Sequence, residues 1–103
     1  MDLKIIWSPD AGNDLEAIFN YISRDSVTIA AKVAERILAA IDRLGLFPHS
    51  GPKIREWRNL PNRHSAVPPY RIIYRVDDGT VVIIAIVHGA QDLKKLMRIP
   101  RRR

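Results

Sequence analysis

The clearest pattern of hydrophobic and polar positions lies between residues 70 and 89, where two strand-like runs flank a turn signal. The runs YRIIYRV and VVIIAIV are rich in β-branched and aromatic residues, which favour strands. Between them stands Asp78-Gly79, a pair that readily adopts the positive φ angles of a two-residue hairpin turn. The sequence therefore predicts a tight β-hairpin in which Asp77 faces Thr80.

This pairing assigns the hairpin side chains alternately to two faces. The first face is apolar and is expected to enter the core; it holds Tyr70, Ile72, Tyr74, Val76, Val81, Ile83, Ala85 and Val87. The second face mixes aliphatic and charged groups; it holds Arg71, Ile73, Arg75, Val82, Ile84, Ile86 and His88. Charged side chains on an inner strand are costly unless they are paired or exposed. We therefore expect function on the second face.

A short strand and a helix are predicted at the start of the chain. Residues 3–7 form a β-rich run. Ser8 and Pro9 then suit the N-cap and the first position of a helix, and apolar residues recur at helical spacing until about Arg24.

A second amphipathic helix is predicted to follow directly. Asp25 or Ser26 is expected to cap its start. Gly45 and Pro48 are expected to end it, with Gly45 as a left-handed C-terminal residue. The two helices form a helical hairpin whose apolar stripes are expected to be core.

Residues 49–69 are the least regular part, because they are rich in proline. Trp57 and Leu60 are expected to attach this segment to the body of the protein. Residues 64–67 are expected to add a strand beside the hairpin, and Pro68-Pro69 make it an edge strand or a bent one.

The predicted element order is therefore strand, two helices and three strands. It indicates an α+β fold, β-α-α-β-β-β, with a small, mostly antiparallel sheet packed on an α-helical hairpin. Whether the first strand joins parallel or antiparallel stays open. Residues 1–93 are expected to form one domain and residues 94–103 a basic C-terminal tail.

Composition narrows the class of protein. The chain of 103 residues has no cysteine, which excludes disulfides and cysteine zinc sites. Its longest apolar run, Val81 to Val87, is too short to span a bilayer, and the N-terminus lacks a signal-peptide pattern. We expect a soluble cytoplasmic protein without a membrane role.

The net charge of +6 is concentrated at one end of the chain. Residues 1–93 hold eleven basic and eleven acidic residues, so the excess comes from six basic residues at positions 94–103. That tail is either a solvated terminus or a nucleic-acid contact. Residues 53–75 are basic within the neutral body and are the better candidate surface for an acidic partner.

Motif searches leave few candidates for chemistry. Glycine-rich phosphate loops and nucleophile motifs are missing, and the three histidines have no metal-ligand spacing. We expect no cofactor and no metal. What remains is Arg71, Arg75 and His88, with Gln91 and Asp92 just past the strand. The guanidinium groups suit an anion or an acidic partner, and an internal Arg71–Asp92 ion pair is the alternative.

Several short motifs together resemble the RelE/ParE superfamily of type II toxins. They are W-S-P-x-A, D-L-E-x-I and Y-I within residues 7–22, F-P-x-S-G at 47–51, Y-R-I-I-Y-R-V at 70–76 and V-H-G-x-x-D-L at 87–93. The resemblance covers about residues 3–93 and implies the strand–two helices–three strands fold reached above.

The RelE branch of this superfamily consists of ribosome-dependent mRNA endonucleases. By resemblance, Arg71 matches one arginine of their catalytic set. A second arginine falls on Gln91, a lysine pair falls near Asn62 and His64, and a terminal tyrosine falls near Met97. Arg71 with His64 or His88 would supply only part of the charge stabilisation and acid–base chemistry of cleavage.

The helical hairpin and the ending of the last strand look more like the ParE branch, which includes plasmid stabilisation toxins. The resemblance implies a toxin that inhibits DNA gyrase by binding and that a cognate, ParD-like antitoxin neutralises. Direct nucleic-acid binding is expected to be weak or absent, although a tail-driven nucleic-acid-binding module stays a third reading. The predicted partner-binding residues are Arg71, Arg75, His88, Gln91, Asp92, Lys94 and Lys95.

Overall fold

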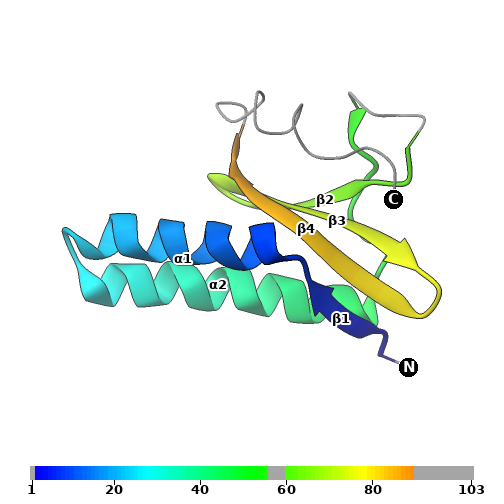
Figure 1. Cartoon of the computed structure of the whole chain (residues 1–103), viewed down its shortest axis with the longest axis horizontal. Helices are drawn as coiled ribbons and strands as arrows, with labels where there is room; N and C mark the ends of the chain where they lie inside the picture. The colour runs from blue at the N-terminus through cyan, green and yellow to red at the C-terminus, as the bar shows by residue number, and fades with distance from the viewer. Residues whose placement is uncertain (1, 56–59, 90–103) are drawn as a thin grey trace.

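Two helices pack against one face of a four-stranded mixed sheet in the computed structural model, which describes residues 2–55 and 60–89 (Figure 1). The elements are β1 (Lys4–Trp7), α1 (Pro9–Ser23), α2 (Val27–Leu46), β2 (Arg63–Val67), β3 (Tyr70–Asp77) and β4 (Thr80–His88). The strand order is β1-β4-β3-β2; β1 pairs parallel with β4, and the other pairs are antiparallel. The predicted α+β fold is confirmed, and the direction of β1 is resolved.

A serine side chain caps the N-terminus of each helix. The Ser8 hydroxyl accepts the Ala11 N–H at 3.1 Å, and the Ser26 hydroxyl accepts the Ile29 N–H at 3.1 Å. These bonds satisfy backbone donors that the first turn leaves without partners. Ser8 therefore caps α1 as predicted, and Ser26 rather than Asp25 caps α2.

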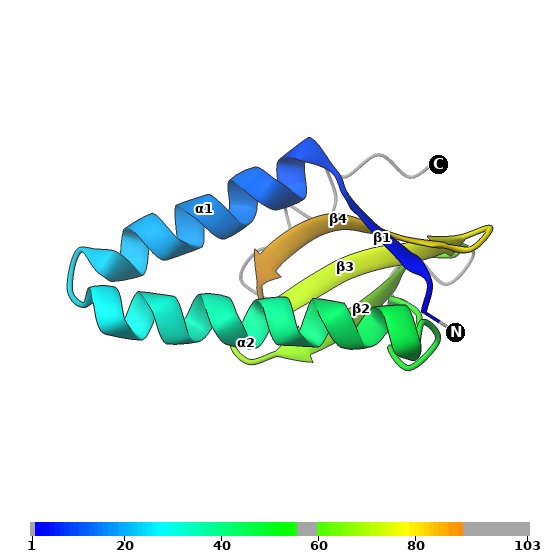
Figure 2. The same cartoon turned by 90° about the horizontal axis from the view of Figure 1, so that it is seen from below.

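The end of α2 differs from the prediction. The helix runs through Gly45 to Leu46, so Gly45 is not a left-handed C-terminal residue. Instead its carbonyl accepts the Leu3 N–H at 2.8 Å, and a Cβ at position 45 would lie 3.2 Å from the Leu3 carbonyl oxygen. The glycine lets the chain that enters β1 lie directly against the last turn of α2 (Figure 2).

Both sheet faces are apolar near the middle of the strands. The core between the sheet and the helices contains Ala11, Ile37, Ile41, Leu44, Val67, Ile72, Tyr74, Val81, Ile83 and Ile86. A smaller cluster contains Ile54, Ile73, Ile84, Ala85 and Val87, with Leu60 packed against it. The helix stripes are core as predicted near the sheet, whereas Ile29, at the predicted start of the second stripe, is 55% exposed. Leu60 attaches the irregular segment. Trp57 lies outside the described residues.

The β3–β4 hairpin has the predicted turn. Asp77 pairs with Thr80, and Gly79 has a φ of +67°. The register then shifts between Ile73 and Tyr74, since Ile73 pairs with Ala85 and Tyr74 with Ile83. A β-bulge therefore stands at Ile84, which has no partner of its own.

The bulge overturns the predicted faces for the end of β4. Past Ile84 the alternation is offset by one residue, so Ile86 belongs to the core under the helices. Ala85 and Val87 belong to the opposite cluster. His88 pairs with Tyr70, which packs on the helix side, so its predicted place beside Arg71 was wrong.

The start of α1 holds the bulged part of β4. The Ser8 N–H donates to the Ile83 carbonyl at 2.9 Å, and the Ser8 hydroxyl donates to the Ile84 carbonyl at 2.8 Å. The Asp14 carboxylate accepts the Ile86 N–H at 2.9 Å. These contacts bond the edge of β4 beyond the last residue of β1. The residues at the start of α1 therefore help to fix the register of β4.

The irregular segment adds β2 as predicted, at the edge of the sheet. Among residues 2–55 and 60–89, no helix has the length and apolar character needed to cross a membrane.

Candidate functional site

The candidate site is the sheet face turned away from the helices, which we call the Arg71 face. His64 pairs with Ile73, and Arg71 pairs with Ala66 on one side and Val87 on the other. Directly paired residues share a face, so Arg71, Arg75 and His64 lie together with the smaller apolar cluster. Figure 1 shows α1 and α2 along the other face. Two of the predicted hairpin residues, Arg71 and Arg75, therefore share the face, whereas His88 does not.

Arg71 has an unusual environment for a charged side chain. It is half-buried on inner strand β3, between the small side chain of Ala66 and the apolar Val87. Its Nε is buried and has no hydrogen-bond partner within the described residues. A buried donor without an acceptor costs free energy. Because the Arg71 side chain as a whole is only half-buried, an acidic group brought to this face could still bind its guanidinium.

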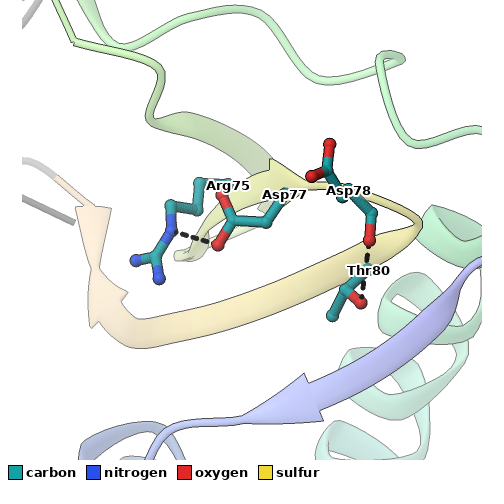
Figure 3. Close-up of polar contacts among 4 residues, drawn as sticks. All are labelled: Arg75, Asp77, Asp78 and Thr80. Atoms are coloured by element: carbon teal, nitrogen blue, oxygen red, sulfur yellow. Dashed lines mark hydrogen bonds and ion pairs between the residues drawn. The ribbon is translucent and has the colours of Figure 1, made fainter.

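Arg75 differs because it has an acidic partner on its own strand. Its Nε donates to the Asp77 carboxylate at 2.9 Å (Figure 3). The Arg75 side chain is 21% exposed and that of Asp77 is 50% exposed. The ion pair neutralises part of the charge of Arg75, so Arg71 is the stronger candidate for binding an acidic group.

The two histidines of the hypothesis lie on opposite sides of the sheet. His64 stands diagonally across from Arg71, because His64 pairs with Ile73 and Arg71 pairs with Ala66. His88 packs edge-on against the Tyr70 ring, with ring centroids 5.4 Å apart. Only His64 thus shares a face with Arg71.

The remaining predicted binding residues, Gln91, Asp92, Lys94 and Lys95, lie outside the described residues. The Arg71–Asp92 ion pair therefore stays a prediction. Asn62, where the resemblance sets one lysine of the catalytic set, is 4% exposed, and its carbonyl accepts the Ile54 N–H at 3.1 Å. An almost fully buried amide cannot replace an exposed cation.

A buried tyrosine latch, which the sequence did not predict, fixes the segment before β2. The Tyr74 hydroxyl donates to the Pro48 carbonyl at 2.8 Å and accepts the Gly51 N–H at 3.0 Å. A Cβ at Gly51 would collide with the His64 carbonyl and lie 2.7 Å from the Tyr74 oxygen. Burial raises the pKa of Tyr74 above its ordinary value of 10.0, and the Gly51 bond opposes part of this rise. The F-P-x-S-G motif at residues 47–51 was the sequence signal for this contact, because it contains both Pro48 and Gly51.

The chemistry available on the Arg71 face is binding of an acidic group. Within the described residues it offers one guanidinium with an unused N–H, one ion-paired guanidinium and one imidazole. No group of three or more metal-ligating side chains occurs in that part of the chain. Phosphoryl transfer requires several positioned charges around the reacting oxygens, and the described part of this face supplies two guanidinium groups and one imidazole toward that requirement.

Comparisons of the sequence with known proteins agree on one family. The model of the ParE toxin of the type II toxin-antitoxin system parDE matches residues 5–93. The toxin RelE2 of Caulobacter vibrioides is 36% identical over 88 residues, which are 85% of this chain and 97% of that toxin.

Solved structures share the fold. A chain of the chromosomal ParDE system of P. aeruginosa superposes with a TM-score of 0.72 at 21% identity, covering 84% of this chain and 96% of that one. A chain of the toxin-antitoxin complex RelBE2 of Mycobacterium tuberculosis superposes with a TM-score of 0.59 at 25% identity, covering 85% and 99%. The relatives thus include both ParE-named and RelE-named toxins.

Proposed function

The chain belongs to the ParE toxin family of type II toxin-antitoxin systems, and we propose that it inhibits DNA gyrase by binding and carries out no hydrolysis of its own. The observation that carries this proposal is the Arg71 face, where one guanidinium has a buried N–H without a partner in the described part of the chain. The Arg71 side chain is only half-buried, so its guanidinium is suited to bind an acidic surface of a target protein.

The incomplete catalytic set supports binding over cleavage. The position that resembles a catalytic lysine is the buried amide of Asn62, and Gln91 stands where the resemblance expects an arginine. An endonuclease that relies on electrostatic stabilisation of the reacting phosphate would lose most of its rate without these cations. A binding inhibitor has no such requirement.

A cognate antitoxin, of the ParD type or similar, completes the proposal. The ParDE and RelBE2 structures are both from toxin-antitoxin systems, and the RelBE2 structure is of the complex. We assign this chain a partner of that kind, which neutralises it. Because gyrase acts on DNA in the cytoplasm, we also place the protein there.

A supercoiling assay tests the proposal. Purified protein is incubated with gyrase and plasmid DNA, and supercoiling and cleaved complexes are measured. We expect inhibition by the natural protein and at least about tenfold weaker inhibition by Arg71→Ala, as for the loss of a charged hydrogen bond. Arg24→Ala is the control, because it removes an exposed arginine at the tip of the helical hairpin. Absence of both effects on gyrase would falsify the proposal.

A ribosome-dependent mRNA endonuclease is the second candidate function. It is favoured by the identity to RelE2 and by the placement of His64 on the same face as Arg71. Translating ribosomes with a reporter mRNA decide this candidate. Codon-phased cleavage that is lost in both Arg71→Ala and His64→Gln supports it. Cleavage that persists unchanged in Arg71→Ala, or no cleavage at all, excludes it.

A further inference from the structure

The outer edge of β1 is an open strand edge. β1 is a terminal strand of the sheet, and Figure 1 shows it at the lower margin of the sheet. The Lys4 N–H donates toward β4, to the Gly79 carbonyl at 3.2 Å. Backbone groups alternate in direction along a strand, so those of Ile5 and Trp7 point away from β4. Within the described residues, neither Ile5 nor Trp7 has a backbone partner on that side.

The open stretch is closed at both ends. The Leu3 N–H, which also points outward, donates to the Gly45 carbonyl of α2 at 2.8 Å. At the other end, Ser8 caps α1 and the chain leaves the sheet. The unpaired N–H and carbonyl groups of Ile5 and Trp7 therefore form an edge that matches a strand of only a few residues.

The side chains of this stretch are apolar and incompletely covered. Ile6 is 44% exposed and lies beside Val82 on the sheet face turned away from the helices. Ile5 and Trp7 pack against the core on the helix side and are half-buried. An open strand edge with exposed apolar side chains favours pairing with another strand.

The stretch is complementary to a second copy of itself. When two β1 strands run antiparallel about a two-fold axis at Ile6, Ile5 of each copy lies opposite Trp7 of the other. Both residues direct their backbone groups outward, so each such pair exchanges two hydrogen bonds. Ile5 and Trp7 also form an aromatic and β-branched cross-strand pair, which stabilises a sheet. Ile6 lies opposite its own copy, and this contact covers its exposed side chain.

The charges near this edge are compatible with such a pairing. The register sets Lys4 opposite Ser8 of the other copy, next to the start of an α1 helix whose first turn carries the exposed Asp10. Within the described residues, neither Lys4 nor Asp10 has an ion-pair partner. The two Lys4 backbone positions lie about 13.6 Å apart along the strands, which exceeds the Debye length of about 8 Å at physiological salt. The pairing therefore brings opposite charges together and keeps the lysines apart.

We propose that the chain forms a weak homodimer through the β1 edge, in which two four-stranded sheets join into one. A second copy fits this edge better than a flexible peptide, because its β1 is already ordered and a peptide loses conformational entropy to make the same bonds. The interface is short, so we expect a dissociation constant between about 10 µM and about 1 mM. Because β4 separates β1 from β3, which holds Arg71, this inference is independent of the proposed function.

Cysteine crosslinking tests the position of the two-fold axis. The chain has no cysteine, and the axis sets the two Cα atoms of position 6 about 4.5 Å apart, within the range of a disulfide. Under mild oxidation, Ile6→Cys is expected to form a disulfide-linked dimer at least about tenfold faster than Leu38→Cys. Leu38 is the matched control, because it is 42% exposed and lies on α2. Equal rates for the two variants would indicate random collision and would overturn the proposal.

A charge at position 6 tests the interface without oxidation. Sedimentation equilibrium at protein concentrations up to about 1 mM measures the dissociation constant. Ile6→Lys sets two like charges opposite each other at the axis, so we expect at least about tenfold weaker dimerisation, against less than about twofold for Leu38→Lys. Circular dichroism and the urea midpoint confirm that both variants fold. A natural protein that stays monomeric, or an unchanged constant for Ile6→Lys, would contradict the dimer.

NMR on a mixture of isotope-labelled and unlabelled protein identifies the contacts. We expect intermolecular cross-peaks between Ile5 of the labelled copy and Trp7 of the unlabelled copy. Dimerisation without these cross-peaks would set the interface elsewhere and would overturn the proposal. Protection of the Ile5 and Trp7 amides from hydrogen exchange only after another protein is added would assign the edge to that protein, with the same consequence.

Discussion

Arg71 and Tyr74 lie three residues apart on β3, and their polar atoms have opposite environments. The Arg71 Nε is buried without an acceptor in the described part of the chain, whereas the Tyr74 hydroxyl has both an acceptor and a donor. An odd separation along a strand sends the two side chains to opposite faces. At the scale of the residue, one strand therefore supplies both the proposed binding group and a structural latch.

Replacing Tyr74 by phenylalanine is expected to destabilise the fold by about 1–3 kcal/mol, because the Pro48 carbonyl and the Gly51 N–H lose a buried partner. The raised pKa of Tyr74 adds a pH dependence. The unfolded chain ionises this tyrosine near its ordinary pKa, whereas the folded chain holds the proton to higher pH. The stability is thus complete below the ordinary pKa and falls as pH rises through the folded value.

Urea unfolding between neutral pH and about pH 11 measures both effects. Tyr74→Phe should lower the urea midpoint at neutral pH. It should also make the midpoint fall less as the pH rises. Tyr21→Phe is the control, because the Tyr21 side chain is 69% exposed. An unchanged midpoint in the Tyr74 variant, or the same alkaline decline in both variants, would contradict the latch.

At the scale of the element, most of the fold could be predicted from the sequence. The sheet face to which each side chain of β4 points could not. The Asp78-Gly79 turn and the serine caps are local signals, so they were predicted correctly. The bulge at Ile84 depends on bonds from Ser8 and Asp14, which are 76 and 72 residues away from their β4 partners. Strict alternation therefore placed Ala85 and His88 wrongly. The face of Arg71 was predicted correctly because Arg71 lies on β3, and the extra residue in β4 leaves the alternation along β3 unchanged.

The two helical glycines give a prediction about how elements approach one another. Gly12 has nothing within 4 Å of the place of a Cβ, so Gly12→Ala is expected to stabilise α1 by about 0.5–1 kcal/mol. A Cβ at Gly45 lies 3.2 Å from the Leu3 carbonyl oxygen. There the same helix-propensity gain is offset by displacement of the chain before β1, so Gly45→Ala is expected to destabilise by about 1–3 kcal/mol. Thermal unfolding of the two variants checks the sign, and stabilisation of both would show that β1 does not need this close approach.

At the scale of the whole molecule, the Arg71 face meets a groove at Ala66, which is the cavity of about 500 Å³ between the C-terminal half of α2 and the β2 edge. The Ala66 backbone points outward to the groove, and its side chain lies beside Arg71 on the sheet face. A strand added at Ala66 would lie two strand spacings, about 9–10 Å, from the backbone of Arg71. A partner bound in the groove would therefore obstruct the approach of a large target to Arg71.

This geometry predicts that inhibition and neutralisation can be separated by single substitutions. Arg71→Ala is expected to lose gyrase inhibition and to keep antitoxin binding, because Arg71 lies on the sheet face and not in the groove. Arg43 lines the groove, and Arg43→Glu is expected to keep inhibition and to need at least about tenfold more antitoxin for neutralisation. Supercoiling assays with increasing antitoxin measure both quantities for each variant. If each substitution weakened both activities equally while the unfolding midpoints stayed unchanged, the toxin and antitoxin contacts would coincide, and neutralisation would be direct competition for Arg71.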